Sequence, residues 1–330
     1  MKNIGLFCFL LLSLGCARPH TGKIVQVEIL DPAVKNILDE QVEIEVIATG
    51  FVWSEGPLWL AESKTLIFSD VPNNVIHSWS EAGGVKKYLE PSGYTGAVPR
   101  GGEMGSNGLA LSLENTLLLC QHGDRRVASM DAPLSAPRPA FITLAGQFEG
   151  KKFNSPNDVA VRNNGDMYFT DPPYGLMGLD KDSTKETPVN GVYRISKGTV
   201  TLLVDSLSKP NGIAFLPDGK TFIVANSDGA KPIWYAFDVN EQDSVYNARI
   251  FYDATEAFKK EGGGPDGLKV DKKGNVFATG PGGIWIFNAS GKVLGKIKLE
   301  GRVSNCALDT EERTLFVTNA DRVLRIKLKK

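Results

Sequence analysis

One pattern recurs six times along this chain and strongly limits what it can fold into. Each copy opens with Ser or Pro followed by Glu, Asn or Asp, continues as an apolar stretch, crosses a polar turn such as PDGK or KKGN, and ends in a second apolar stretch. Polar turns between two such stretches are typical of β-hairpins. The copies begin at Ser54, Ser106, Pro156, Pro210, Pro265 and Ser304. The sequence therefore predicts a fold assembled from six units that each contain a hairpin.

The spacing of the copies predicts the size of each unit. The copies begin about 50 residues apart, with a shorter last interval, and this length suits a four-stranded propeller blade. Further strand-like stretches follow the first five hairpins, including NGVYRIS and PIWYAFD. We therefore predict an all-β protein, a six-bladed β-propeller with four-stranded antiparallel blades.

The sixth copy is too short to supply four strands by itself. After its hairpin only RVLRIKL remains, whereas the stretch Val42–Thr49 precedes the first copy and is unused. A propeller is closed when such a strand completes the last blade, because closure leaves no exposed sheet edge. We expect residues 42–49 to pair with the C-terminal strands, and residues 42–330 to form one propeller with no further domain boundary.

The first residues, MKNIGLFCFLLLSLGC, have the features of an export signal. Lys2 precedes an apolar run from Ile4 to Leu14, which is too short to span a bilayer comfortably. Gly15-Cys16 resembles a bacterial lipoprotein cleavage site. We expect a signal peptide over residues 1–16 with cleavage before Cys16, lipidation of Cys16, and export to the bacterial periplasm or cell envelope; residues 17–41 would then be a tether. Secretion with Cys16 unmodified is the alternative.

Charge and cysteine content exclude several other classes of protein. The net charge is −1 and no long basic run is present, which argues against binding to nucleic acid. Apart from the lipid anchor, nothing in the sequence predicts a membrane role. Beyond the signal only Cys120 and Cys306 remain, both in apolar strand-like stretches. We expect two buried free thiols, and neither a disulfide framework nor a cysteine zinc site.

The polar residue near the start of each copy is the strongest functional signal. In a propeller the innermost strands begin at one mouth of the central channel, so these side chains should converge there. They are Glu55, Asn107, Asn157, Asn211, Asp266 and Asn305. Two carboxylates with amide oxygens suit Ca²⁺, and Mg²⁺ or Mn²⁺ less well, whereas the absence of His and Cys disfavours a dedicated zinc site. Taken singly, each of these residues could instead be a turn former.

The motifs SEGPLW, SPNDVAV, FTDPPYGL, KPNGIAF and PDGLKVD resemble those of the gluconolactonase and regucalcin-like family of six-bladed propellers. The resemblance runs from about Val46 to the C-terminus. It implies a single divalent metal at the channel mouth, most often Ca²⁺, with Mg²⁺, Mn²⁺ or Zn²⁺ as alternatives. By motif, the implied ligands are Glu55, Asn157, Asn211 and Asp266, although Asn157 could be a substrate contact instead.

The resemblance also implies hydrolysis of a small sugar lactone. In that scheme the metal polarises the ring carbonyl and Asp266 acts as general base for water, while Glu55 is a ligand alone. A nucleophilic Asp266 is left open. Candidate substrate contacts on the surrounding segments are Arg100, Glu103, Asn107, His122 and Tyr174. For His122 and Tyr174, a purely structural role is an equal alternative.

Two rival functions are compatible with the same fold. The chain could be a non-catalytic propeller that binds sugars or a protein partner, since fold alone does not decide function. It could also hydrolyse phosphotriesters or other esters. The placement of two acids among the converging residues favours a metal-dependent hydrolase, and no G-x-S-x-G motif indicates a serine nucleophile.

Overall fold

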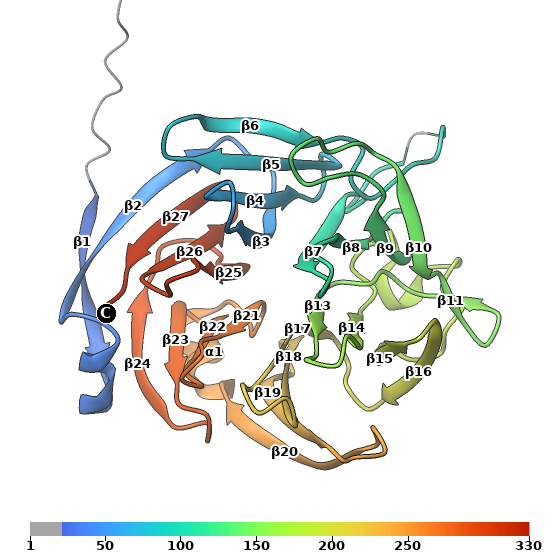
Figure 1. Cartoon of the computed structure of the whole chain (residues 1–330). Coiled ribbons are helices and arrows are strands. Elements are labelled where there is room, and N and C mark those ends of the chain that lie inside the picture. Colours follow the sequence, from blue (N-terminus) through green and yellow to red (C-terminus); the bar gives the residue numbers. More distant parts are fainter. Residues whose placement is uncertain (1–21, 99, 330) are drawn as a thin grey trace, which may run out of the picture.

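A computed structural model describes residues 22–98 and 100–329, and small antiparallel sheets form a ring in it (Figure 1). The fold is all-β, as predicted, and the arrangement is compatible with a β-propeller. The expected signal peptide and Cys16 lie outside the described residues. In the described part of the chain, no helix is long and apolar enough to cross a membrane.

Four of the sheets have four strands each, and consecutive strands are neighbours. The first contains β3 (Ser54–Leu60), β4 (Thr65–Asp70), β5 (Val75–Ser80) and β6 (Gly84–Leu89). The second contains β7 (Ser106–Leu111), β8 (Leu117–Gln121), β9 (Arg126–Met130) and β10 (Phe141–Ala145). The third contains β13 (Val159–Val161), β14 (Met167–Asp171), β15 (Gly191–Ser196) and β16 (Thr199–Val204). The fourth contains β17 (Pro210–Phe215), β18 (Thr221–Asp228), β19 (Lys231–Val239) and β20 (Val245–Asp253).

The remaining large sheet has nine strands and joins the two ends of the chain. One half contains β21 (Leu268–Val270), β22 (Val276–Gly280), β23 (Gly283–Phe287) and β24 (Val293–Lys298). The other contains β25 (Asn305–Leu308), β26 (Thr314–Asn319), β27 (Arg322–Lys327) and β2 (Gln41–Thr49). Strand β2 pairs antiparallel with β27, with Ile44 opposite Ile326. The expected pairing of residues 42–49 with the C-terminal strands is therefore confirmed.

Part of the segment expected to be a tether is integrated in this sheet. Strand β1 (Lys23–Ile29) pairs with β2 on one side and with β24 on the other, and the 3-10 helix η1 (Pro32–Asn36) follows it. Val27 and Val34 are buried, in one apolar cluster with Leu294. The cause is the alternation of apolar residues in KIVQVEI, which gives the segment an inner face. Residues 23–36 are therefore packed in the folded part of the chain.

The apolar core lies between neighbouring sheets. Trp234 of β19 is fully buried, with its ring centroid 5.4 Å from that of Phe287 in β23. Trp59 of β3 stacks on Phe316 of β26 at 5.2 Å, across the contact between the first sheet and the C-terminal strands. Such aromatic pairs add packing energy to the burial of their area. Cys120 and Cys306 are buried free thiols, as expected.

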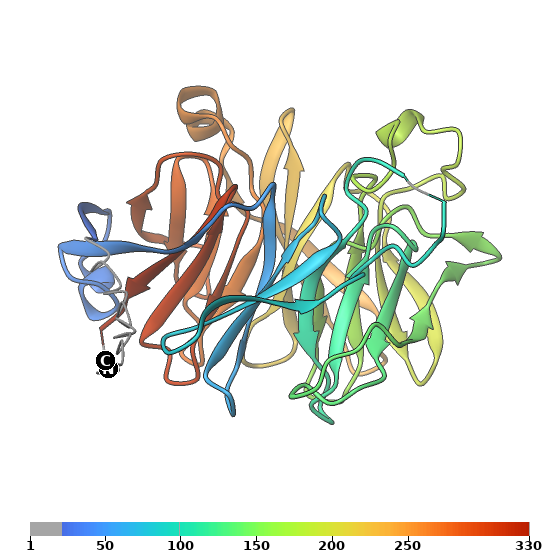
Figure 2. The same cartoon turned by 90° about the horizontal axis from the view of Figure 1, so that it is seen from above.

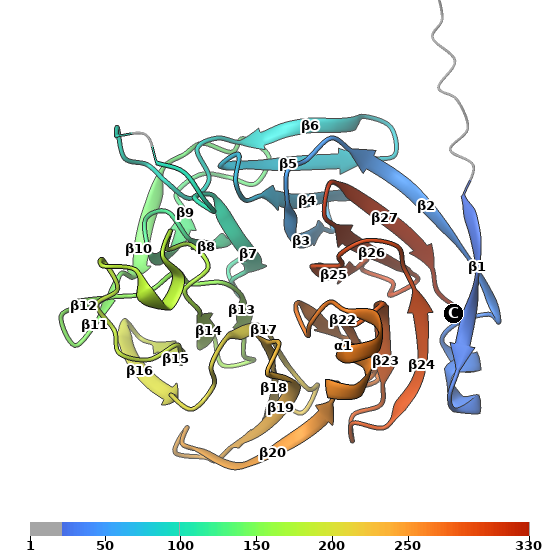
Figure 3. The ribbon, with the colours of Figure 1, turned by 180° about the vertical axis from the view of Figure 1, so that it is seen from behind.

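Short elements outside the sheets mark one face of the ring. The helix α1 (Thr255–Glu261) and the segment with η2 (Leu179–Lys181) project from the same face (Figure 2). Figure 3 shows α1 toward the viewer beside β22 and β24. A two-stranded hairpin, β11 (Gln147–Phe148) and β12 (Lys151–Lys152), lies at the periphery.

Candidate functional site

The strands at the inner edges of the sheets bring the repeated polar residues together. These strands contact one another in succession, from β3 to β7, β13, β17, β21 and β25, and β25 contacts β3 again. Their backbones are also joined directly: Gly108 N–H donates to Asn157 O and Gly267 N–H donates to Ser304 O, both at 2.7 Å. Because each inner strand begins close to the next, the side chains at these starts face a common space.

Close contacts between the inner strands explain why glycine follows the polar residue in several copies of the repeat. Gly56 has φ +49°, and a Cβ there would lie 2.0 Å from Asn107 O. A Cβ at Gly267 would lie 2.0 Å from the side chain of Asn305. Side chains at these positions would force the inner strands apart. The acid-Gly and Asn-Gly pairs of the sequence repeat are therefore a signature of strands that approach closely around one axis.

The common space is a pocket of about 850 Å³. Seven of the residues predicted for the site line it: Glu55, Glu103, Asn107, Asn157, Tyr174, Asn211 and Asp266. Arg100 and His122 are outside the lining. Burial raises the pKa of the Tyr174 hydroxyl, and the negative charge of Asp266 raises it further.

Two carboxylates dominate the electrostatics of the pocket, that of the buried Glu55 and that of the partly buried Asp266. Glu55 is 3% exposed, and its Oε2 accepts the N–H of Gly56 at 3.0 Å. Burial raises the pKa of Glu55, and the hydrogen bond from Gly56 opposes the shift only in part. Burial also raises the pKa of Asp266, and the negative charges of Glu55 and Glu103 raise it further. A positive charge between these groups would reverse both effects.

The donor set of the pocket fits a hard divalent cation. Asp266 Oδ1 is buried and has no hydrogen-bond partner among the described residues. Beside the two carboxylates, Asn107, Asn157 and Asn211 contribute side-chain amides to the same lining. Within residues 22–98 and 100–329, no three His, Cys, Asp or Glu side chains form a metal-type cluster, so amide oxygens would have to complete the coordination. Carboxylate and amide oxygens are the ligands that Ca²⁺ prefers.

A further acid, fully buried, follows the pocket residue Asn157 in the chain. Asp158, next to Asn157, is 1% exposed, and its Oδ1 accepts the N–H of Val159 at 2.9 Å. Its Oδ2 lies 3.7 Å from Lys269 Nζ. Burial raises the pKa of Asp158, and Lys269 opposes the shift. The sequence motif PND included this acid, but only its Asn was predicted to belong to the site.

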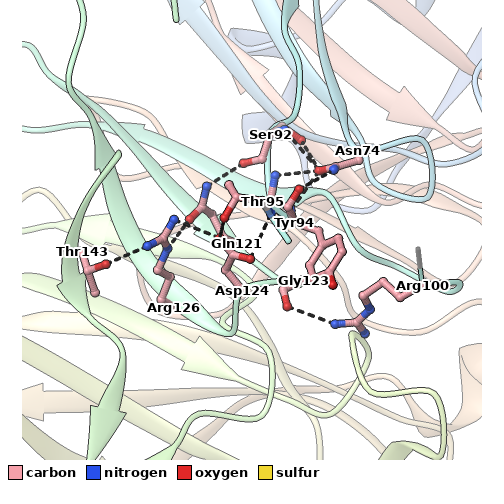
Figure 4. Close-up of polar contacts among 11 residues, drawn as sticks. Asn74, Ser92, Tyr94, Thr95, Arg100, Gln121, Gly123, Asp124, Arg126 and Thr143 are labelled. Atoms are coloured by element: carbon pink, nitrogen blue, oxygen red, sulfur yellow. Dashed lines mark hydrogen bonds and ion pairs between the residues drawn. The ribbon is translucent and has the colours of Figure 1, made fainter. Parts of the chain in front are cut away.

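Arg100 is occupied by main-chain carbonyls. Its Nη1 donates to Gly123 O at 3.0 Å and its Nη2 donates to Gly175 O at 2.5 Å. Figure 4 shows the guanidinium pointing to Gly123, beside Tyr94, whose ring centroid is 5.7 Å away. In this structure Arg100 therefore ties together the segments that surround the pocket and does not face the pocket itself.

His122 lies behind Glu103. The imidazole is fully buried, and its Nδ1 is 3.2 Å from Glu103 Oε2. Neither ring nitrogen makes a hydrogen bond of good geometry within the described part of the chain, so this contact is a close approach of suboptimal direction. The Glu103 side chain is one-third exposed and reaches the pocket. His122 is thus outside the pocket lining, next to Glu103, which is part of it.

Helix α1 contributes pocket residues that the sequence did not predict. Phe258 and Glu261 of α1 line the pocket, and so does Ser227 of β18. The sequence contains local signals for both ends of α1. Asp253 Oδ1 accepts the N–H of Thr255 at the helix start, and Gly262, with φ +66°, follows the helix end. Such start and stop signals mark even a short helix.

Comparisons with known proteins show which proteins this chain resembles. Residues 53–321 match a family model described as SMP-30/Gluconolactonase/LRE-like region. A gluconolactonase of Zymomonas mobilis is 37% identical over 315 residues, which cover 93% of this chain and 86% of that protein. The pentonolactonase XacC of Haloferax volcanii is 25% identical and covers 83% of this chain and 84% of its own length. The solved structure of a gluconolactonase from Xanthomonas campestris aligns with a TM-score of 0.79 and 28% identity, covering 95% of this chain and all of that one.

Proposed function

This chain belongs to the SMP-30/gluconolactonase/LRE-like family and is a lactonase, and we propose that it opens a sugar lactone in a metal-dependent reaction. The observation that carries the proposal is the pair of acids in one pocket, the buried Glu55 and the partly buried Asp266. Each has a raised pKa, and Asp266 Oδ1 has no partner within the described residues. Two such uncompensated acids are costly unless a cation joins them.

Ca²⁺ is the proposed cation, held by Glu55, Asn157, Asn211 and Asp266. The all-oxygen donor set supports this choice and leaves Mg²⁺, Mn²⁺ and Zn²⁺ as alternatives. When bound, Ca²⁺ would supply Lewis-acid chemistry by drawing electron density from the lactone carbonyl. Glu55 is assigned as a ligand alone, since its Oε2 already accepts hydrogen bonds from Gly56 and Asn305.

Asp266 is the proposed general base. Its carboxylate takes a proton from water while the water oxygen forms a bond to the carbonyl carbon. The bond between that carbon and the ring oxygen then breaks, and the proton passes to the departing ring oxygen, which becomes a hydroxyl group. Glu103, Asn107 and Tyr174 line the same pocket and are proposed to orient the hydroxyl groups of the substrate.

The test is hydrolysis of glucono-δ-lactone in a weakly buffered, Ca²⁺-containing solution, with spontaneous opening subtracted. We expect enzymatic turnover in the wild type. A single turnover in ¹⁸O-labelled water distinguishes the two roles of Asp266. General-base action puts the label directly into the first product, whereas a nucleophilic Asp266 releases an unlabelled first product when water opens the anhydride at the Asp266 carbonyl. Absence of turnover on any aldonolactone would contradict the proposed function.

The ring is proposed to have six blades. The nine-stranded sheet then counts as two blades, β21–β24 and β25–β27 with β2, which β1 joins at their outer edges. The succession of contacts among the inner strands, which returns from β25 to β3, supports this count.

Export with a lipid anchor at Cys16 is also a proposal, supported by the signal-like residues 1–16. Mass spectrometry of the protein from a membrane fraction should find a lipid-modified Cys16 as the first residue. A Cys16→Ala variant should then be lost from that fraction. An unmodified N-terminus that begins elsewhere would contradict the anchor.

A further inference from the structure

The pocket extends far beyond the two acids. Its volume of about 850 Å³ is in the upper part of the range of roughly 300 to 1,000 Å³ that holds drug-sized ligands. A one-ring sugar lactone is much smaller than such ligands. The pocket extends to α1 and the segment after it, and its lining includes Phe258, Glu261, Gly262–Gly264 and Arg302. One ring bound at Asp266 would leave this side of the pocket empty.

Helix α1 is fixed in place as a wall of the pocket. Lys296 of β24 is buried, with its side chain 3% exposed, and its Nζ donates to Glu261 Oε2 at 2.6 Å. The same ammonium lies 4.6 Å from the ring centroid of Trp285. Only the Lys296 side of this ion pair is buried, and removal of Glu261 would leave a buried ammonium without its partner, which is destabilising. Lys296 therefore ties the C-terminal end of α1 to the sheet.

The other contact of α1 is apolar. Phe258 packs against Gly229, where an added Cβ would lie 3.0 Å from the ring. The helix is thus held from two sides, by Phe258 at Gly229 and by Glu261 at Lys296. After Glu261 the chain continues through Gly262–Gly264 directly to Pro265 and Asp266. The wall and the proposed base therefore belong to one continuous segment.

The chemistry of this wall suits a neutral, polyhydroxylated ring. Phe258 offers an aromatic surface, while Glu261 and Arg302 offer an acceptor and donors beside it. The charge of Glu261 is balanced by Lys296. The three consecutive glycines expose backbone without side chains, which allows a ligand to approach the main chain closely. An aromatic face with a few polar groups is the usual make-up of a small-molecule subsite.

We propose that α1 and the turn Gly262–Gly264 form a second subsite, which holds a further sugar attached to the lactone ring. The preferred substrates are then glycosylated aldonolactones, with two sugar units. This inference rests on the proposed lactonase function, because it names the substrate class of the same pocket. The first sugar, as the lactone, lies at Asp266, and the second lies against Phe258 and Glu261.

The test compares glucono-δ-lactone with the lactones of cellobionic and maltobionic acids, which carry the same ring with one added glucose. We expect kcat/KM of the wild type to be at least tenfold higher for one of the two-sugar lactones, mainly through a lower KM. Equal or lower kcat/KM for both would overturn the subsite and leave the lactonase function intact. A preference for lactones with an acyl chain would also overturn it. No turnover of any lactone would remove both proposals together.

Two variants test the location of the subsite. A Cβ at Gly264 would meet only the main chain of Ser227, at 3.7 Å or more, and the residue is outside the left-handed region. Gly264→Leu should therefore fill the subsite without backbone strain and lower the ratio of two-sugar to one-sugar kcat/KM at least tenfold. Lys296→Met releases Glu261 and should lower the same ratio.

Lys259→Met is the matched control on the same helix. Lys259 is 64% exposed and pairs with Glu256, so its replacement should change the ratio less than twofold. Thermal unfolding of all three variants identifies any general loss of structure. If Lys296→Met does not fold, Gly264→Leu alone tests the location of the subsite. An unchanged ratio in Gly264→Leu would overturn the proposed location.

Discussion

Asn305 Nδ2 donates to Glu55 Oε2 at 3.4 Å, although the two residues are 250 positions apart. Beside them, Ser304 Oγ donates to Ser54 O at 2.6 Å. These contacts join the first repeat to the sixth at the point where the ring closes. Closure of the ring thus brings the Asn305 amide to the Glu55 carboxylate, which also accepts the N–H of Gly56. The site can form only when the whole ring has formed.

Glu55→Gln should weaken Ca²⁺ binding. The amide keeps the size of the side chain and can still face Asn305, but it removes one of the two negative charges proposed to bind the cation. We expect the dissociation constant from calorimetry to rise at least tenfold. Glu300→Gln, at a side chain that is 78% exposed, is the control and should leave the affinity unchanged. Equal affinity in Glu55→Gln would remove this residue from the ligand set.

Asp266→Asn should abolish most of the hydrolysis without unfolding the protein. Loss of a general base typically costs about 10²–10⁴-fold in rate. Without metal, the variant should be at least as stable as the wild type. The reason is that Asn carries no negative charge, whereas the Asp266 carboxylate is repelled by Glu55. The measurement is kcat/KM at saturating Ca²⁺, together with thermal unfolding. Activity near that of the wild type would show that Asp266 is not the base.

Asp171→Asn should destabilise the protein in a pH-dependent way. Asp171 is fully buried and accepts the N–H groups of Asn154 and Ser155, each at 2.8 Å. Burial raises its pKa to about 7, and these hydrogen bonds oppose the shift. The Asn side chain has one acceptor oxygen, so one of the two N–H groups loses its partner. The variant should therefore lose about 1–3 kcal/mol of unfolding free energy at low pH.

The sign of the pH dependence follows from the raised pKa. Because folded Asp171 keeps its proton to higher pH than the unfolded chain does, its contribution to the unfolding free energy is complete below about pH 4. It is lost as the pH rises to about 7, by at most about 1.4 kcal/mol per pH unit. Urea unfolding of both proteins should show the largest difference at pH 4 and a narrowing toward pH 7. A difference that grows with pH would refute this account.

Arg325→Ala should weaken the closure of the ring. Arg325 of β27 forms a salt bridge to Glu45 of β2 at 2.6 Å, pairs with Glu81, and lies 5.4 Å from the ring centroid of Trp79. Its side chain is only 20% exposed, and we expect a loss of about 1–2 kcal/mol. Lys23→Ala breaks an exposed pair with Glu300 and should cost about 0–1 kcal/mol. Equal losses of unfolding free energy in the two variants, measured by chemical unfolding, would contradict a special role for Arg325.

The repeat made much of the fold and of the candidate site predictable. Period-two strands and glycine turns are local signals, and the repetition fixed where each inner strand begins. For this reason the repeat alone predicts that six side chains converge, and all but the last of them line one pocket: Glu55, Asn107, Asn157, Asn211, Asp266 and Asn305. The Glu-Gly and Asp-Gly pairs carry this information most directly, because their glycines are required where neighbouring inner strands meet.

Residues outside the repeat were less predictable. Arg100 and His122 belong to connecting segments whose path depends on contacts such as that of Arg100 with Gly175 O, to which no local pattern points. Helix α1 has only seven residues, too few for a helical period to be recognised. Strand β1 owes its place to β24, which is far away in the sequence. In each case a contact between distant segments decides the structure.

The most direct test of the central claim is lactone hydrolysis by metal-stripped protein with Ca²⁺, Mg²⁺, Mn²⁺ and Zn²⁺ returned separately. We predict that stripping abolishes the turnover of aldonolactones and that Ca²⁺ restores it best. Full activity after stripping, verified by elemental analysis, would contradict a metal-dependent reaction at Glu55 and Asp266. Tight metal binding without turnover of any lactone would contradict the proposed substrate.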